Sequence, residues 1–353
     1  MRNYDYTEKW KKLLTPQIVN YLTMIHEYKG EQRLIANRHA DVLDALVEVA
    51  KIQSTESSNK IEGIYTSDER LKKIVLDKTM PRSRNEREIA GYRDVLSTIH
   101  ENNEHIPIRS TFILQLHRDL YKFENGGMGG TFKNVDNIIE EENSEGIKSV
   151  RFQPVAAWET PDSVDKLCEA YNNAIARTDA DPLLIIPMFV LDFLCIHPFR
   201  DGNGRMSRLL TLLLLYKSEY IVGKYISIEK LIEATKESYY DTLKDSSRMW
   251  HEEENDYIPF VIYLLGVIAA AYKDFLERTR LIEEKTTAKP DRVAEEIKKH
   301  IGTITKSEIM QNLPGVSQTT VQRTLAELTN QGMIKKIGNG RYTKYTWNWE
   351  NEL

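Results

Sequence analysis

Twelve consecutive residues, His197 to Arg208, constrain the fold of this chain more than any other stretch. They have the sequence HPFRDGNGRMSR and combine an imidazole, a carboxylate, an amide, two glycines and three arginines. Long apolar runs precede and follow them, at residues 183–194 and 209–215, and both predict buried helices. A polar loop between two buried helices must satisfy its backbone groups with a ligand, a side-chain network or water. We therefore expect the chemistry of this protein at the loop.

The length and composition of the chain narrow its class. A chain of 353 residues is too long for one small core, which predicts two or three domains. The net charge of −5 argues against a chain dominated by contacts with nucleic acid. No signal-peptide pattern is present, and the most apolar stretch, residues 260–272, suits a core helix. Cys168 and Cys195 lie in apolar helical patterns and are expected to be buried, reduced thiols. These features predict a cytoplasmic protein that does not associate with membranes.

Most of the chain carries the spacing of amphipathic or buried helices. Apart from the flanks of the loop, we expect helices from residue 16 and over residues 40–57, 84–101, 110–123, 163–178, 227–243 and 258–285. A glycine-rich segment at 125–130 interrupts this pattern, and residues 131–139 and 148–153 predict two short strands. The fold class is therefore mainly α with a small β-hairpin. An inserted hairpin is either a lid or binding edge, or a surface decoration without function.

The pattern changes again after a short polar hinge at residues 286–290. Helices are predicted over 291–300, 305–312 and 318–331, with Ser317 as the N-cap of the third. Residues 334–345 then alternate around an Asn339-Gly340 turn, which is typical of a β-hairpin. Three helices and a two-stranded wing predict a winged helix-turn-helix domain at residues 290–353.

The central loop has the residue types that bind a phosphate. Its glycines let backbone N–H groups approach an anion at the start of a helix, where the helix dipole adds positive charge. Arg205 and Arg208 can present forked donors to further phosphate oxygens. Asp201 is a hard oxygen ligand suited to Mg²⁺, and His197 is a general base for neutral pH. The alternative is a buried histidine beside a helix cap with surface arginines, which this combination and spacing disfavour.

The stretch from His197 to Arg208 matches the signature HPFx(D/E)GNGRxxR without departure, so the chain resembles the Fic family. This resemblance implies a Fic helical bundle with a hairpin flap. It also implies transfer of AMP from ATP to a Tyr, Ser or Thr hydroxyl of a target protein, and of the enzyme itself, with release of pyrophosphate. His197 would accept the proton of the attacking hydroxyl, and Asp201 would hold Mg²⁺ between the α- and β-phosphates.

The resemblance also assigns the remaining nucleotide-binding and target-docking residues. Gly202, Asn203 and Gly204 would cradle the phosphates, Arg205 would neutralise the β-phosphate, and Arg208 the γ-phosphate. The full nucleotide-binding set is Arg200, Asp201, Gly202, Asn203, Gly204, Arg205 and Arg208 of the motif, with Tyr239 and Tyr240 near the adenine. The flap that docks the target protein would contain Lys133, Ile138 and Ile139. The sequence departs from the usual family pattern at Lys133, where arginine is common, and at Ser247, where asparagine is common.

A second, shorter pattern lies more than a hundred residues upstream. Ser58 to Gly63 fits (S/T)xxxE(G/N), which marks the Fic class with an N-terminal inhibitory helix, here at about residues 55–63. Taken alone these residues predict only a solvated helix end. Beside the full motif, the resemblance implies that Glu62 pairs with Arg208 and inhibits the enzyme, with Ser58 in the same regulatory segment. The predicted domains are residues 1–103 with that helix, 104–285 as the catalytic core, and 290–353.

Two alternatives differ from this interpretation in function. One is a DNA-binding regulator whose Fic body senses a nucleotide, and the other is a Fic transferase that uses another donor. Gly204 favours AMP transfer over the kinase activity of the Doc toxins, which resemble this motif but carry lysine at that position. Residues 290–353 hold nine Lys/Arg and seven Asp/Glu, and a net charge of +2 is small for a DNA-binding domain. We therefore favour a protein-docking or homodimerisation role for this domain over DNA binding.

Overall fold

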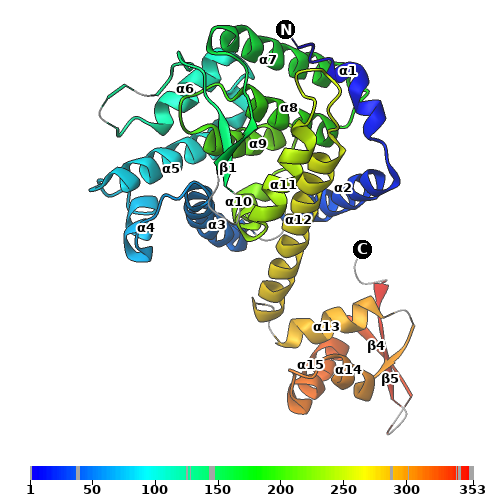
Figure 1. Ribbon diagram of the computed structural model, residues 1–353. Helices are drawn as coiled ribbons and strands as arrows, with labels where there is room; N and C mark the ends of the chain where they lie inside the picture. Colours follow the sequence, from blue (N-terminus) through cyan, green and yellow to red (C-terminus); the bar gives the residue numbers. More distant parts are fainter. Residues whose placement is uncertain are drawn as a thin grey trace. The chain divides into compact units, whose positions relative to one another are not determined.

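The computed structural model describes residues 2–36, 40–124, 126–127, 129–142, 148–286, 289–300, 302–338, 340 and 343–349 (Figure 1). It divides into two compact units, Met1–Glu277 and Arg278–Leu353, with the division inside the long helix α12. Each unit has its own buried apolar core.

The first unit is built almost entirely from helices, which confirms the predicted mainly α fold. Its helices are α1 (Tyr6–Lys9), α2 (Pro16–Ala36), α3 (Ala40–Ile61), α4 (Asp68–Val75), α5 (Arg84–Asn102), α6 (Ser110–Leu120), α7 (Thr160–Arg177), α8 (Pro182–Ile196), α9 (Asn203–Lys217), α10 (Ile228–Ala234), α11 (Lys236–Ser247) and α12 (Ile258–Thr286). Short 3-10 turns lie at Trp10–Leu13, Asn103–His105, Ala157–Glu159 and Val222–Lys224. The single helix predicted over residues 227–243 is wrong, because the backbone leaves the helical region at Thr235 and separates α10 from α11.

Helices α8 and α9 lie at the centre of this unit and carry the predicted loop between them (Figure 1). The side chain of Asp181 caps α8 by accepting a hydrogen bond from the backbone of Leu183, and Pro182 occupies the first helical turn. Nearly every residue of both helices is buried, as expected for helices that are apolar on all sides. The loop is therefore fixed at both ends by the core of the unit.

One helix is long and apolar enough to pass a length and composition test for a membrane span. This stretch, Ile258–Leu281, lies within α12, and 56% of its most apolar window is buried inside the structure. Its inner face includes Phe260, Leu264 and Ile268, which belong to the same hydrophobic cluster as α8 and α9. The burial fits the core helix that the sequence predicted. Both cysteines are also buried and free, as expected.

A buried carboxylate fastens the N-terminal residues to α8. Asp192 accepts hydrogen bonds from the hydroxyls of Tyr6 and Tyr257 and from the indole N–H of Trp250. The guanidinium of Arg2 lies 3.7 Å from the same carboxylate. Because a buried charge is costly unless it is paired and hydrogen-bonded, the contacts of Asp192 with Arg2 and Tyr6 hold residues 2–6 against the helical core.

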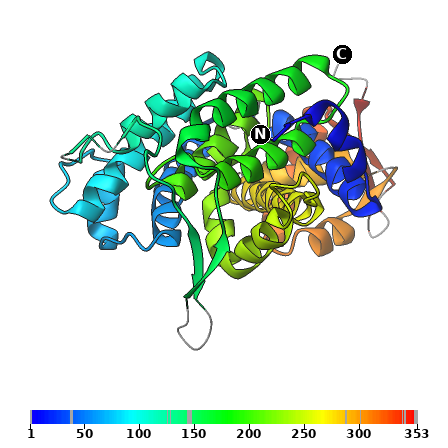
Figure 2. The ribbon, with the colours of Figure 1, turned by 45° about the horizontal axis from the view of Figure 1, so that its top comes forward.

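The β-hairpin consists of β1 (Ile139–Glu142) and β2 (Lys148–Phe152), paired antiparallel and projecting from the helices (Figure 2). The strand predicted over residues 131–139 is wrong except at its last residue. Residues 131–138 follow the central loop instead, since the backbone N–H of Lys133 donates to Pro198 O and the Asn137 amide donates to Phe199 O. In residues 131–138, hydrogen bonds to the loop take the place of hydrogen bonds between strands. They connect the hairpin to the motif.

The second unit has helices α13 (Lys289–Lys299), α14 (Lys306–Asn312) and α15 (Gln318–Asn330), with strands β3 (Ile304–Thr305), β4 (Ile334–Ile337) and β5 (Lys344–Trp347). The strands form one antiparallel sheet in the order β3-β5-β4. Thr305 and Glu308 form a capping box at the start of α14, and Ser317 caps α15 as predicted. The three helices and the β4-β5 pair follow the order of elements that the sequence predicted for this domain, with the added strand β3. The predicted turn residue Asn339 lies outside the described residues.

Candidate functional site

The loop from His197 to Arg208 is held in shape by its own side chains. The Asn203 amide accepts a hydrogen bond from Phe199 N at 2.9 Å and donates one to Phe199 O at 2.8 Å. The buried side chain of Asn203 therefore stabilises the loop, and the assignment of Asn203 to the phosphate cradle stays a prediction. Gly202 has φ of +81° and begins α9, and a Cβ there would lie 2.9 Å from the hydroxyl of Tyr121. Both its conformation and the close approach of Tyr121 require glycine.

His197 ends α8 in the left-handed conformation, with φ of +50°, and its backbone N–H donates to Phe193 O. Its Nδ1 lies 3.3 Å from the carbonyl oxygen of Leu194. Because a carbonyl oxygen only accepts, Nδ1 carries the proton in this contact and Nε2 keeps its lone pair. Burial, with a smaller effect of the nearby Lys133, lowers the pKa of His197 to about 4. The imidazole is therefore neutral and able to accept a proton at physiological pH.

Arg208, on the second turn of α9, is buried against the end of α3. Its Nε donates to the Ser58 hydroxyl, and its Nη2 donates to both Ser58 O and Glu62 Oε1, at 2.7 to 2.8 Å. The Arg208 side chain is 2% exposed and the Glu62 side chain is 32% exposed, so Glu62 is the more solvent-exposed member of the ion pair. The ion pair expected between Glu62 and Arg208 is present. The Nη1 of Arg208 is buried and has no hydrogen-bond partner among the described residues.

The position of Glu62 depends on how α3 ends. The helix stops at Ile61, whose carbonyl oxygen accepts a hydrogen bond from Lys236 Nζ, and Gly63 adopts φ of +77°. The carboxylate then lies directly over Gly204, where a Cβ would come within 2.2 Å of Glu62 Oε1. Gly204 is thus the residue that allows the end of α3 to reach the motif.

A cavity lies in front of His197 and Arg208. Its polar walls include Glu62, and its apolar walls come from α8, the hairpin and α11. The lining residues are Glu62, Ile139, Arg151, Phe152, Leu191, Leu194, Cys195, His197, Gly204, Arg208, Tyr239, Tyr240, Leu243 and Ser247. The structure therefore brings together the predicted base, the predicted regulatory pair and both predicted aromatic residues.

The other predicted residues lie around this cavity in different environments. Asp201 and Arg200 line a neighbouring cavity with Tyr121 and Lys133, and the Asp201 Oδ1 accepts a hydrogen bond from Gly202 N. Arg205 is 1% exposed, with Nη2 at 2.8 Å from Glu88 and 2.7 Å from the Tyr121 hydroxyl. Glu88 thus holds the arginine that the resemblance assigned to the β-phosphate.

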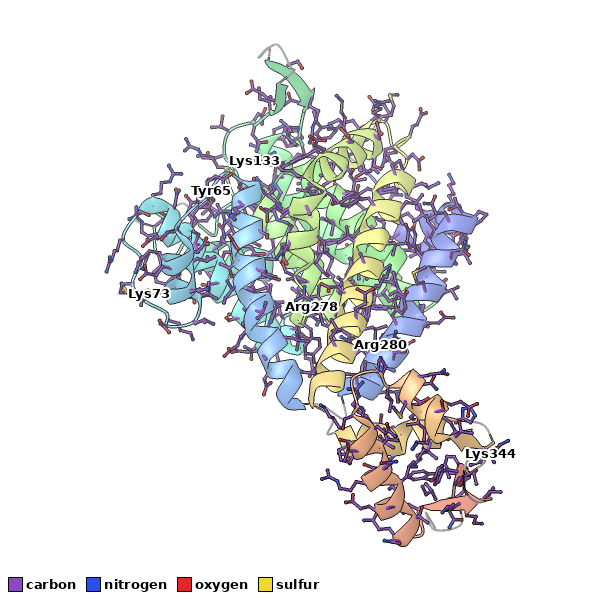
Figure 3. The ribbon with its side chains drawn as sticks, turned by 90° about the horizontal axis from the view of Figure 1, so that it is seen from below. Tyr65, Lys73, Lys133, Arg278, Arg280 and Lys344 are labelled. Atoms are coloured by element: carbon purple, nitrogen blue, oxygen red, sulfur yellow. The ribbon has the colours of Figure 1, made fainter. Side chains whose placement is uncertain are left out.

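Lys133 needs a correction, since the resemblance placed it in a surface that docks a target protein. It is 4% exposed, and its Nζ donates to Ile196 O and to the Asn137 side chain. Figure 3 labels it at the base of the hairpin. The lysine is buried because Ile196 O, at the end of α8, needs a donor, and it therefore positions the loop. Ile138 is 49% exposed, which leaves it accessible to a partner, and Ile139 lines the cavity.

Sequence reasoning missed several residues of the site. His117 accepts a hydrogen bond from Gly130 N and contacts Asp201 O through Nε2, while its ring stacks on Phe199 at 3.6 Å. Burial lowers its pKa to about 4, which keeps it neutral in this bridge. Glu88 and Arg151 were also missed. All three lie in ordinary amphipathic patterns, so only their spatial contacts distinguish them from surface residues.

Comparisons with known proteins found similar domains in both units of the chain. Residues 107–215, which run from the start of α6 to the end of α9, match the Fic/DOC family, and residues 288–348 match a domain described as "Transcriptional regulator DIP2311-like, C-terminal domain". A Fido domain-containing protein of Dictyostelium discoideum is 29% identical over 126 residues, which are 35% of this chain and 83% of that protein.

Solved structures share the fold. A Fic family protein from Desulfovibrio desulfuricans has a TM-score of 0.61 at 21% identity, covering 95% of this chain and 97% of that one. A Fic domain-containing signaling protein from Bacteroides thetaiotaomicron also has a TM-score of 0.61, at 19% identity, covering 73% of this chain and 98% of that one. Fic-1 from C. elegans has a TM-score of 0.59 at 19% identity, covering 75% and 73%.

The helical body and its motif loop define a protein with the Fic fold. Residues 107–215 are similar to the Fic/DOC family, and proteins with that domain are typically transferases that move nucleotide-derived groups onto proteins.

The state of His197 can be observed directly. We expect the Nδ1-protonated neutral tautomer to persist from pH 7 to pH 5, because protonation requires the pH to fall toward about 4. Nitrogen-detected NMR of ¹⁵N-histidine-labelled protein, with His197→Gln to assign the signal, measures both tautomer and titration. A His197 signal that titrates near the unperturbed value of about 6.5 would contradict the described environment.

Proposed function

We propose that this protein is an adenylyltransferase that moves AMP from ATP to a Tyr, Ser or Thr hydroxyl of a target protein, and to itself. The observation that carries the proposal is the placement of a neutral histidine, with Nε2 free to accept a proton, in one cavity with Arg208 and two tyrosines. The target hydroxyl loses its proton to His197 Nε2 as its oxygen bonds to the α-phosphorus. The bond from that phosphorus to the pyrophosphate oxygen breaks, and pyrophosphate leaves.

The chain's own residues supply positioning and charge in this reaction. Tyr239, Tyr240 and Leu243 form an apolar and aromatic wall of the cavity suited to a base, and the guanidinium of Arg208 lines the same cavity. The buried, unpartnered Nη1 of Arg208 is a donor in need of an acceptor, and a phosphate oxygen would satisfy it. Preorganised charge of this kind is the main means of catalysis in phosphate transfer.

Mg²⁺ would be bound with the nucleotide at Asp201. Among the described residues no group of three His, Cys, Asp or Glu side chains could hold a metal alone. Asp201 is exposed, and its Oδ1 accepts one backbone hydrogen bond. A single carboxylate fits Mg²⁺, which keeps waters and takes further ligands from substrate phosphates. When bound, the ion neutralises phosphate charge and so assists departure of pyrophosphate.

The end of α3 would regulate the transfer. Glu62 and Ser58 occupy two of the three nitrogens of the Arg208 guanidinium, and the Glu62 carboxylate adds negative charge beside the site that the γ-phosphate would need. A nucleotide could then enter the cavity without reaching the orientation in which the α-phosphate faces His197. We therefore assign Glu62 the role of an inhibitor within the same chain.

Glu62→Gly should raise incorporation of α-³²P label from ATP into the protein or a target in cell lysate about tenfold or more, because Arg208 becomes free to bind phosphate. Glu56→Gly is the matched control, since Glu56 belongs to the same helix but pairs with Lys60. Labelling in the Glu62→Gly background should disappear with His197→Ala while ATP still binds. Unchanged labelling in Glu62→Gly would remove Glu62 from its role, and labelling that survives His197→Ala would require another base.

A second function is favoured by the match of residues 288–348 to a transcriptional-regulator domain. In the structure Lys335, Lys336 and Lys344 are exposed on the strands of the wing. A wing with exposed lysines can contact DNA phosphates. The small net charge of the domain is the argument for protein docking instead. We infer that DNA binding is the function to test here.

The full-length chain should be retained on double-stranded DNA cellulose at about 50 mM salt and released as salt rises, because lysine contacts to phosphate displace counterions. Lys335→Gln with Lys336→Gln should weaken retention. Lys73→Gln, at an exposed lysine of α4, is the control. Equal elution of all variants at low salt would leave protein docking as the function of this domain.

A further inference from the structure

The two strands of the hairpin are out of register at one residue. Glu140 of β1 pairs with Val150 of β2, and Ile139 pairs with Phe152, so Arg151 lies opposite no residue. This is a β-bulge, which inserts one extra residue into a strand and redirects its side chains. In a regular strand neighbouring side chains point to opposite faces. Here Arg151 and Phe152 both line the cavity in front of His197, while Val150 is 57% exposed.

The bulge therefore places a cation from the hairpin inside the candidate active site. The Nε of Arg151 is buried, and within the described part of the chain it has no hydrogen-bond partner. Burial is the main cause of the shifted pKa values of His197 and Tyr240, and the charge of Arg151 contributes to both, which places it near each of them. A buried donor without an acceptor is costly, so this position calls for a ligand that accepts hydrogen bonds.

The charges of the cavity indicate what that ligand is. Its charged lining residues are Glu62, Arg151 and Arg208, and His197 is neutral. Glu62 and Arg208 neutralise each other through their ion pair, which leaves the charge of Arg151 facing the cavity. An arginine guanidinium binds phosphate oxygens through forked N–H donors.

We propose that Arg151 binds the phosphate chain of the nucleotide, from the hairpin side of the cavity, and fixes the hairpin over the bound donor. This inference rests on the proposed function for the identity of the donor. The side chain of Glu62 accepts its described hydrogen bond from Arg208 and none from Arg151, so Arg151 can engage phosphates while the inhibitory pair is intact. The inhibited enzyme thereby keeps affinity for a nucleotide that it cannot yet use.

Isothermal titration calorimetry on full-length His197→Ala protein tests this without turnover. The probes are Mg-ATP, inorganic tripolyphosphate and adenosine. Arg151→Ala should raise the Kd for Mg-ATP and for tripolyphosphate about tenfold, as expected for loss of a charge-assisted contact, and leave the Kd for adenosine within twofold. Arg151→Lys should recover part of the loss, because it keeps the charge without the fork.

Arg248→Ala is the matched control, since Arg248 is an exposed arginine paired with Asp245 on the same unit. Unchanged affinity for both phosphate ligands in Arg151→Ala would overturn the proposal. An equal loss for adenosine would also overturn it, since that result indicates a collapsed cavity. Because binding is measured in a protein that cannot transfer AMP, an absence of AMP labelling in the Glu62→Gly assay would refute the proposed function separately.

Discussion

A buried arginine organises the candidate site. Arg208 lies in the interior of the first unit, where an uncompensated guanidinium would be strongly unfavourable, and the end of α3 supplies its acceptors. The position of the end of α3 therefore determines whether the charge of Arg208 in the cavity is neutralised. A nucleotide phosphate would offer the same guanidinium the same kind of acceptor. Residues 58–62 and the phosphate are thus expected to compete for one cation.

Three constrained backbone positions bring residues 58–62 next to the motif loop. His197 ends α8 in a left-handed conformation, Gly202 begins α9 in another, and Gly63 ends the α3 segment in a third. Gly204 then gives Glu62 the space to approach the motif. Lys133 and His117 add hydrogen bonds from outside the motif, to Ile196 O and Asp201 O respectively. These contacts fix the loop in one conformation without a ligand, and catalysis relies on preorganised groups of this kind.

Periodicity and the positions of glycines predicted the helical body and the end of α3 at Gly63, whereas the contact between Glu62 and Arg208 was implied only by the resemblance to the Fic family. They failed where a contact depends on residues that are distant in sequence. Lys133 looked like a flap residue because its buried acceptor, Ile196 O, lies sixty-three positions away. Glu88 gave no signal because its partner Arg205 is on another helix. The bulge at Arg151 depends on strand register, which alternation alone does not specify when both strands are short.

The most direct test of the account compares the affinities of Mg-ATP and Mg-ADP, because only ATP has the γ-phosphate that should compete with Glu62. Calorimetry on the His197→Ala protein should give similar Kd values for the two nucleotides while Glu62 is present. With Glu62→Gly added, ATP should bind about tenfold more tightly than ADP, since Arg208 then gains a phosphate ligand. The same ratio of Kd values with and without Glu62 would contradict the claim that Glu62 withholds Arg208 from the nucleotide.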